Sequence, residues 1–256
     1  MTARHIIMRA VPGLPLVEPG DDLGHLLADA LERAEIAPRT QDILVIAQKV
    51  VSKAEGRYVD LAEVVPSPYA RRLAAEVDKD ARLVEVILSQ SDEVVRYRKG
   101  VLVVAHKLGF VMANAGVDQS NIEQPDGRER VLLLPEDPDG ACALIKARLD
   151  ARFGVELGVV INDSFGRPWR NGVVGVALGA AGLPALLDLV GELDLYGRAL
   201  RVTEVPLADE IAAAASLVMG QASEGMPVVH VRGLAWQTPP SAATALIRPR
   251  ETDLFR

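Results

Sequence analysis

The stretch NAGVDQSN, residues 114–121, combines side chains that bind hard cations. It places the carboxylate of Asp118 beside the hydroxyl of Ser120 and the amide of Asn121. So much Gly and Asn favours neither a helix nor a strand, so we expect a loop. Its oxygen donors suit Mg²⁺ or Mn²⁺. Side chains that merely bond their own backbone explain one such loop equally well.

A second polar stretch, INDSFGRPWRNG at 161–172, follows an apolar strand, and we expect it also to be a loop. Asp163 and Ser164 come first, and Arg167 and Arg170 follow. Loops at strand ends often carry function because a rigid scaffold aims them. Two acidic loops, each at the end of a strand, favour a shared metal ion. The arginines could equally be solvated surface charge.

Two lysines, Lys49 and Lys53, stand four residues apart just after an apolar strand. If the segment 45–57 is helical, they share a face and repel each other unless an anion lies between them. A phosphate chain is such an anion, although two solvated lysines would explain the pattern as well.

A Gly-punctuated stretch, MGQASEGMP at 219–227, lies between a predicted helix and a predicted strand. Backbone N–H groups in such a loop can approach a phosphate closely, and Gln221 and Glu224 offer oxygens to a cation. Neither usual phosphate-binding fingerprint, the P-loop or G-x-G-x-x-G, occurs in the sequence. The histidines lie in no catalytic motif, so a Ser-His-Asp hydrolase is disfavoured.

Composition narrows the classes of protein. With 49% hydrophobic and 25% charged residues, the chain can bury a sizeable core. A net charge of -7 and 4% aromatic residues argue against a nucleic-acid partner. The single cysteine, Cys142, permits no internal disulfide and suits a reducing cytoplasm. We expect no signal peptide, because the start, MTARHIIMRAVPG, lacks an apolar core. We expect no membrane span, because the longest uncharged run, which includes 172–187, is shorter than the roughly 18 residues needed.

Hydrophobic periodicity predicts helices and strands that interleave without strict alternation. No linker or repeat divides the chain, so we expect one α+β unit, with two lobes as an option. The expected strands are 5–11, 42–47, a hairpin over 101–116 with its turn at 107–109, 155–164 and 226–233, and the expected helices are 22–35, 67–80, 81–94, 141–154 and 209–220.

Several segments together closely resemble the coenzyme F420:L-glutamate ligase family, also called F420-0:gamma-glutamyl ligase. The similar segments run in order, without large gaps, from about residue 7 to about residue 235. They are GLPL (13–16), QKVVSKAEG (48–56), NAGVDQSN, LLLPEDPDG, INDSFGRPWRNGVVGVALG, DLYGR (194–198), ADEIAAAASLVMGQ (208–221) and VVHVRG.

The resemblance implies an enzyme that adds L-glutamate to the deazaflavin coenzyme precursor F420-0. GTP would activate the coenzyme carboxylate as an acyl phosphate, an amide bond would form, and GDP and phosphate would be released; further γ-linked glutamates could follow. The implied fold is a family-specific α+β fold of two interlocked lobes. The implied protein is a single domain over 1–256 without an appended reductase-like domain, and it forms an intimate homodimer.

The resemblance also assigns residues. Asp118 and Asp163 would hold one Mg²⁺ or Mn²⁺, Ser164 and Gln221 would help hold a second, and K⁺ is a further ion of the family. Catalytic roles are expected for Lys49, Lys53, Arg167 and Arg170. Arg167, Arg170 and Arg198 are candidates to bind substrate carboxylates, because a guanidinium group binds a carboxylate through two hydrogen bonds. The residues expected to contact GTP are Gly13, Leu14, Pro15, Leu16, Gln48, Lys49, Lys53, Asn121, Met219, Gly220, Gln221, Ala222, Ser223, Glu224, Gly225 and Met226.

Two alternatives stay open at this point. A metal-dependent nucleotide phosphohydrolase could use the same acidic loops on water. A nucleotide-binding regulatory module could use them without chemistry. Archaeal members of the resembled family tend to carry small hydroxyl residues where Gln48 and Lys49 stand and an acid where Gln221 stands, so the second metal is expected to bind more weakly here.

Overall fold

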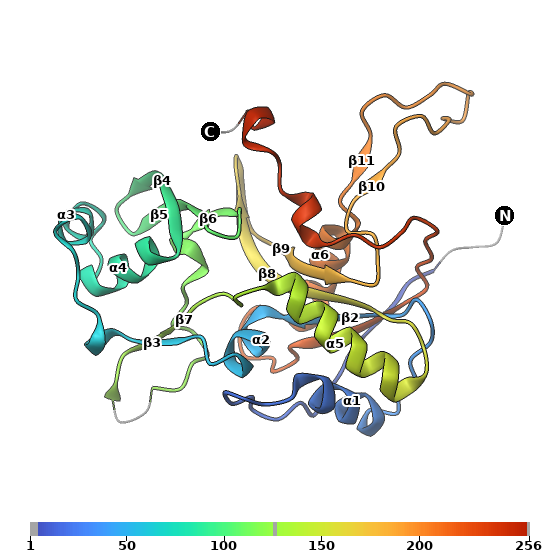
Figure 1. Ribbon diagram of the computed structural model, residues 1–256, viewed down its shortest axis with the longest axis horizontal. Coiled ribbons are helices and arrows are strands. Elements are labelled where there is room, and N and C mark those ends of the chain that lie inside the picture. The colour runs from blue at the N-terminus through green and yellow to red at the C-terminus, as the bar shows by residue number, and fades with distance from the viewer. Residues whose placement is uncertain (1–4, 125–126, 255–256) are drawn as a thin grey trace.

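A five-stranded mixed sheet lies at the centre of the computed structural model, which describes residues 5–124 and 127–254 (Figure 1). In order across the sheet the strands are β1 (Ile7–Ala10), β12 (Val228–Arg232), β2 (Ile43–Ala47), β8 (Gly158–Arg167) and β9 (Arg170–Ala181). β2 and β8 run parallel, and all other neighbours are antiparallel. The prediction of an α+β fold is confirmed.

Helices cover both faces of this sheet. One face carries α1 (Leu23–Arg33), α2 (Gln48–Ala54) and α5 (Pro138–Phe153), and the other carries α6 (Leu207–Met219). Because side chains alternate along a strand, Leu44 and Ile46 of β2 pack toward the first face and Ile43 and Val45 toward the second. Each fully buried aliphatic side chain contributes about 1.5–3 kcal/mol to folding stability. Because both faces of β2 are buried, its sequence is a continuous apolar run and does not alternate with polar residues.

A second lobe has its own hydrophobic core. It consists of α3 (Pro68–Val77), α4 (Ala81–Ser89) and an antiparallel sheet of β4 (Ser91–Arg98), β5 (Val101–His106) and β6 (Val111–Ala113). Ser67 caps α3 and Asp80 caps α4 through their side chains. Leu73, Ile87 and Leu102 are buried between the helices and the sheet.

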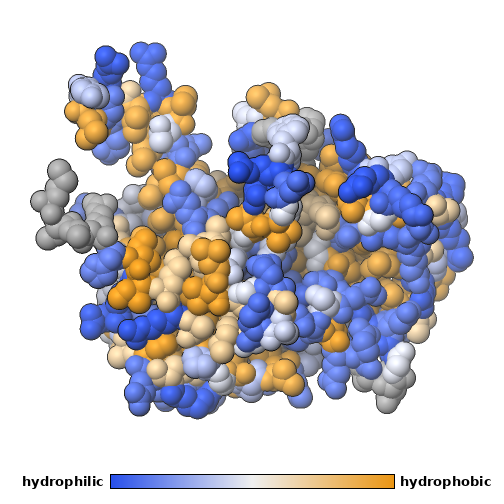
Figure 2. Space-filling model, turned by 180° about the vertical axis from the view of Figure 1, so that it is seen from behind, coloured by the Kyte–Doolittle hydropathy of each residue, from blue (hydrophilic) through white to orange (hydrophobic). Residues whose placement is uncertain are grey.

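Smaller elements connect these units. The strands β3 (Tyr58–Asp60) and β7 (Arg130–Leu132) pair between the central sheet and the second lobe. Single turns of 3-10 helix are η1 (Leu61–Glu63), η2 (Asn114–Gly116), η4 (Ala243–Leu246) and η5 (Arg250–Thr252). The short strands β10 (Leu187–Asp188) and β11 (Glu204–Val205) form the base of an arm that projects away from the body (Figures 1 and 2). Across the described ranges, no helix is long and apolar enough to cross a membrane.

Two expectations about local structure were wrong. The segment 81–94 is not one helix, since α4 ends at Ser89 and β4 begins at Ser91, where pairing with β5 outweighs the helical pattern. The segment 161–172 is not a loop either, because β8 continues through Arg167 and turns into β9 at 168–169. The β-branched Val173, Val174 and Val176 lie opposite the polar end of β8 and extend the ladder. The hairpin predicted over 101–116 is confirmed.

Glycine allows α5 to lie directly on β9. A Cβ atom built on Gly179 would overlap the backbone of Pro138 at the start of α5, and backbone cannot swing aside. We therefore expect Gly179→Ala to lower the free energy of unfolding by roughly 1–3 kcal/mol, as overpacking does elsewhere. Urea unfolding measures this change. Gly166→Ala is the matched control, because its Cβ would meet open space on the same hairpin, and equal losses in both variants would contradict the packing argument.

Candidate active site

Segments far apart in the sequence meet at one edge of the central sheet. Ala47, the last residue of β2, pairs with Asn162 of β8, and Ile46 pairs with Val228, the first residue of β12. Ala10, the last residue of β1, lies one position further along β12. Four segments therefore meet at this edge. They are the loop after β1, the helix α2, the polar part of β8 and the loop before β12.

A lysine from α2 is bound by oxygens of the first acidic loop. The Nζ of Lys49 lies 2.7 Å from Asp118 Oδ2, and it donates to Ser120 Oγ (2.6 Å) and to the Ser120 carbonyl (3.2 Å). Burial would raise the pKa of Asp118, but the Lys49 ammonium and the Ser120 backbone N–H outweigh it and lower that pKa. The other carboxylate oxygen, Oδ1, accepts the Ser120 N–H at 2.7 Å. Asp118 thus both bonds its own backbone and pairs with a cation.

The second lysine reaches the same loop. Lys53 Nζ donates to the Asn121 carbonyl at 2.8 Å, so the two lysines share a face of α2, as their spacing predicts. Burial lowers the pKa of Lys53, the charge on Lys49 lowers it further, and Glu123 opposes both. An anion bound beside the two ammonium groups would relieve their repulsion.

Asp163 lies near Asp118 in space. Burial raises the pKa of Asp163 to about 6. The Asp118 carboxylate adds to the rise, while the Ser164 backbone N–H and Lys49 oppose it. A poorly hydrated carboxylate whose ionisation a second carboxylate disfavours is a group that a divalent cation would stabilise. Among the described residues there is no cluster of three or more acidic, His or Cys side chains that could hold a metal ion.

A second group of polar side chains lies on the opposite face of β8, because neighbouring residues of a strand point to opposite sides. Ser164 Oγ donates to Gln221 Oε1 at 2.8 Å, just beyond α6. On the same face, Asn162 Nδ2 donates to Ser216 Oγ at 3.0 Å, and the buried Asn162 Oδ1 has no hydrogen-bond partner in the described part of the chain. Sequence reasoning missed Asn162; the available signal was its place directly before Asp163.

The 219–226 loop carries backbone donors toward a carboxylate of its own. Glu224 Oε2 accepts the Ala222 N–H at 2.8 Å, and backbone N–H groups of the loop lower the pKa of Glu224. Gly220, with φ +75°, permits the turn, and Glu224 packs so close to it that a Cβ there would clash. Asn121 Nδ2 donates to the Ala222 carbonyl at 3.4 Å, which joins this loop to the first acidic loop.

Other predicted residues lie less centrally. The Gly13–Leu16 loop follows β1 at the same edge, with the Gly13 carbonyl bound by Arg33 and Leu16 exposed. The Gln48 side chain is buried, and its Oε1 accepts from Ser52 Oγ at 2.9 Å. It therefore faces the protein interior.

The arginines are not gathered at the aspartates. Arg167 and Arg170 pair at the tip of the β8–β9 hairpin, about 13 Å along the strand from Asp163. Arg198 lies in the segment between β10 and β11, which extends away from the sheet (Figure 1). Within one copy of the chain, Arg198 does not join the cluster.

Comparison with known proteins identifies the class. The family model for F420-0:Gamma-glutamyl ligase matches residues 13–233. Coenzyme F420:L-glutamate ligase of Methanothermobacter thermautotrophicus is 48% identical over 98% of this chain and 99% of its own length. The protein of the same name from Methanopyrus kandleri is 48% identical over 94% and 93%, and that of Methanocaldococcus jannaschii 41% identical over 95% and 94%.

The chain belongs to the F420-0:gamma-glutamyl ligase family. The resemblance noted in the sequence is thereby confirmed, as is the expectation of an enzyme in the class of ligases that form carbon–nitrogen bonds.

Asp163→Asn is expected to stabilise the chelator-treated protein at neutral pH. The folded-state pKa of about 6 lies above the ordinary 3.8, so ionisation of Asp163 costs stability as pH rises between these values, and the cost stays constant above them. The amide escapes that cost, which gives a gain of roughly 1–3 kcal/mol near neutral pH at about 1.4 kcal/mol per pKa unit. Urea unfolding across pH should show the gain shrinking as pH falls below about 6.

Asp118→Asn is expected to change folding stability in the opposite direction from Asp163→Asn. The lowered pKa of Asp118 means that its ionised form stabilises the fold, a contribution present at neutral pH and lost as pH falls. This variant should be less stable than the unmodified protein at neutral pH. Equal pH profiles for the two variants would refute the assigned environments.

Proposed function

We propose that this enzyme attaches L-glutamate to F420-0, with GTP as the activating co-substrate. The observation that carries the proposal is the meeting of Asp118, Asp163, Lys49 and Lys53 at one sheet edge, in a chain that belongs to this ligase family. The printed names of the relatives support the coenzyme and the amino acid.

The reaction begins with a carboxylate that must be activated, because an oxide ion is a poor leaving group. The terminal carboxylate of the coenzyme attacks the γ-phosphorus of GTP, which forms an acyl phosphate and releases GDP. The amine of glutamate then attacks the acyl carbon, the amide bond forms, and phosphate leaves. Both steps bring negative charges together, so catalysis depends on positioning and on cations.

The proposed cation ligands are two carboxylates and two neutral groups. Asp118 and Asp163 would hold one Mg²⁺ or Mn²⁺, and Ser164 and Gln221 would contribute to a second site or to K⁺. Asn162, whose Oδ1 has no hydrogen-bond partner among the residues that the structure describes, is a further candidate cation ligand on that side. When bound, such ions neutralise phosphate charge and orient the transferring group.

The lysines would act on the phosphates directly. In the structure Asp118 and Ser120 hold the Lys49 ammonium. If Asp118 were a metal ligand, Lys49 would be released from it and would donate to a phosphate oxygen beside Lys53. The backbone N–H groups now directed at Glu224 would likewise serve a phosphate, which is the role proposed for the 219–226 loop.

The remaining proposed contacts surround this centre. Asn121 and the Gly13–Leu16 loop would bind the nucleotide, and Gln48 would do so only through its backbone, since its side chain is buried. Arg167 and Arg170 would bind substrate carboxylates at the hairpin tip.

We also propose that the single-domain chain works as a cytoplasmic homodimer. The arm supports this proposal, because it exposes apolar side chains that a partner could cover, and orange residues on the arm are visible in Figure 2. These exposed side chains include Leu193, Leu195, Tyr196 and Val202. In such a homodimer, the arm of one copy would place its Arg198 on the surface of the other copy.

Asp163→Asn is predicted to abolish most glutamate transfer while the protein stays folded, because the amide keeps the shape and loses the charged ligand. The measurement is incubation with GTP, Mn²⁺, glutamate and F420-0, followed by mass spectrometry of the product. A loss of about 10²-fold or more fits the removal of one essential electrostatic contact. Full turnover by this variant would contradict the metal role.

The same assay separates the alternatives. The ligase requires both coenzyme and glutamate for GTP turnover, whereas a phosphohydrolase would release phosphate without them. A regulatory module would retain GTP unchanged with every substrate present.

Lys53→Ala is predicted to weaken GTP binding, since the half-buried ammonium faces the proposed phosphate position. Calorimetry should show a dissociation constant raised about tenfold, equivalent to about 1.4 kcal/mol. Lys79→Ala, a lysine of the second lobe, is the control. An unchanged dissociation constant for Lys53→Ala would assign this lysine to the solvated surface.

A further inference from the structure

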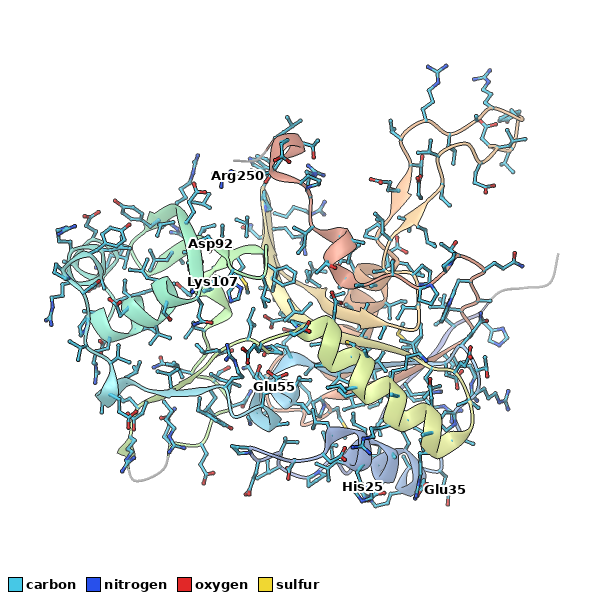
Figure 3. All side chains as sticks on the ribbon, in the orientation of Figure 1. His25, Glu35, Glu55, Asp92, Lys107 and Arg250 are labelled. Carbon is cyan, nitrogen blue, oxygen red and sulfur yellow. The ribbon has the colours of Figure 1, made fainter. Side chains whose placement is uncertain are left out.

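The polar end of β8 contacts two parts of the proposed site, one from each of its faces. Asp163 lies near Asp118 on one face. Asn162 and Ser164 point to the other face, toward α6 and the loop that follows it. This is the opposite face of the sheet from α1, the helix that carries His25 in Figure 3. Adjacent residues of one strand thus reach the acidic loop and the end of α6.

The Asn162 side chain forms a buried hydrogen bond with α6. The residue is 5% exposed, and its Nδ2 donates to Ser216 Oγ at 3.0 Å and to Met219 Sδ at 3.5 Å. Ser216 Oγ donates its own proton to the Ala212 carbonyl at 3.0 Å. Because a hydroxyl group has a single proton, Ser216 must accept the Asn162 N–H with a lone pair. The strand is therefore the donor and the helix the acceptor.

A glycine on β9 allows α6 to come within reach of Asn162. A Cβ atom built on Gly175 would overlap the Ala212 carbonyl and Ser216 Oγ. Gly175 pairs with Ser164 across the ladder, so the helix lies directly on the polar end of the β8–β9 hairpin. This close approach brings the Ser216 hydroxyl to the strands.

Ser216 lies one helical turn before the loop that is proposed to bind phosphate. Its carbonyl accepts the N–H of Gly220, the residue that caps α6, at 3.1 Å. At Gly220 the backbone leaves the helical conformation and the 219–226 loop continues from there. The place of Ser216 on the sheet therefore decides where this loop begins.

The amide of Asn162 has a cost that an apolar side chain would avoid. Its Oδ1 is buried and has no hydrogen-bond partner within residues 5–124 and 127–254, and a buried polar atom without a partner is unfavourable. The preceding residues, Val160 and Ile161, are apolar. An aliphatic side chain would suit the same strand, but apolar contacts have no preferred direction. The hydrogen bond to Ser216 instead selects one position of the helix on the strand.

We propose that Asn162 is a positioning residue, which acts through Ser216 to place the 219–226 loop relative to the cation site on β8. The inference rests on the proposed function, in which this loop binds phosphate, and adds the residue pair that aims it. Asp163 directly follows Asn162, so one short segment of β8 places both the proposed cation ligand and, through the end of α6, the phosphate-binding backbone. A small displacement of such groups is enough to weaken binding and slow the reaction.

Ser216→Ala tests the contact without changing Asn162 or any proposed ligand. Alanine favours a helix more than serine does, so α6 itself should persist. Titration of the full-length protein with GTP in a calorimeter should show a dissociation constant raised about tenfold. In the GTP-free protein, backbone hydrogen exchange over 220–226 should be faster by a similar factor, because the loop loses its anchor.

Asn162→Ala should raise the GTP dissociation constant by about the same factor. The double variant should bind GTP no more weakly than either single variant, because both changes break one contact and their effects do not add. Circular dichroism confirms folding in each case.

Ser241→Ala is the matched control. It removes a hydrogen bond of similar length, from the Ala185 N–H to Ser241 Oγ at 2.9 Å. This bond lies beyond Ala181, the end of β9 that is distant from the polar end of β8. The control should bind GTP normally and leave hydrogen exchange in the loop unchanged.

The outcomes separate the two proposals. If the unmodified protein ligates glutamate and Ser216→Ala binds GTP as tightly as it does, the positioning role is wrong and the proposed function stands. The role is also wrong if only Asn162→Ala weakens binding, if the two effects add, if loop exchange is unchanged, or if Ser241→Ala has the same effect. If the unmodified protein neither binds GTP nor ligates glutamate, both proposals fail.

Discussion

The parallel pairing of β2 with β8 is the constraint on which the site depends. Its register sets Ala47 opposite Asn162, so α2 begins beside the point at which β8 becomes polar. Lys49 then reaches the loop of Asp118, and Asp163 lies one residue further along β8. A slip of one residue would move every β8 side chain to the opposite face, and Asp163 would point toward α6. Burial of both faces of the sheet fixes the register.

Two charged groups at this edge lie where their charged forms are disfavoured. The fold holds Asp163 where burial and Asp118 raise its pKa, and it holds Lys53 where burial and Lys49 lower its pKa. Some of the charges compensate one another, Lys49 for Asp118 and the backbone of the 219–226 loop for Glu224. The raised pKa of Asp163 and the lowered pKa of Lys53 cost folding stability near neutral pH, which is common at functional sites.

The central sheet and the second lobe contribute different features to this region. The central sheet supplies charge and backbone donors at one edge, because strand ends and helix starts meet there. The second lobe and the C-terminal segment together line a cavity of about 610 Å³. Phe165, two residues from Asp163, lines an adjoining cavity of about 230 Å³.

The sequence by itself determined the class of fold, most helices and strands, and the segments that carry charge, because periodicity and residue type are local properties. It placed Lys49 and Lys53 on one helix face correctly. It mistook 161–172 for a loop, because only pairing with β9 makes polar residues extend a strand. Tertiary structure alone decided that Gln48 is buried and that Ser164 contacts Gln221 beyond α6 while Asp163 lies near Asp118. Those facts depend on contacts between residues distant in sequence, and no local pattern encodes which side chains packing will bring together.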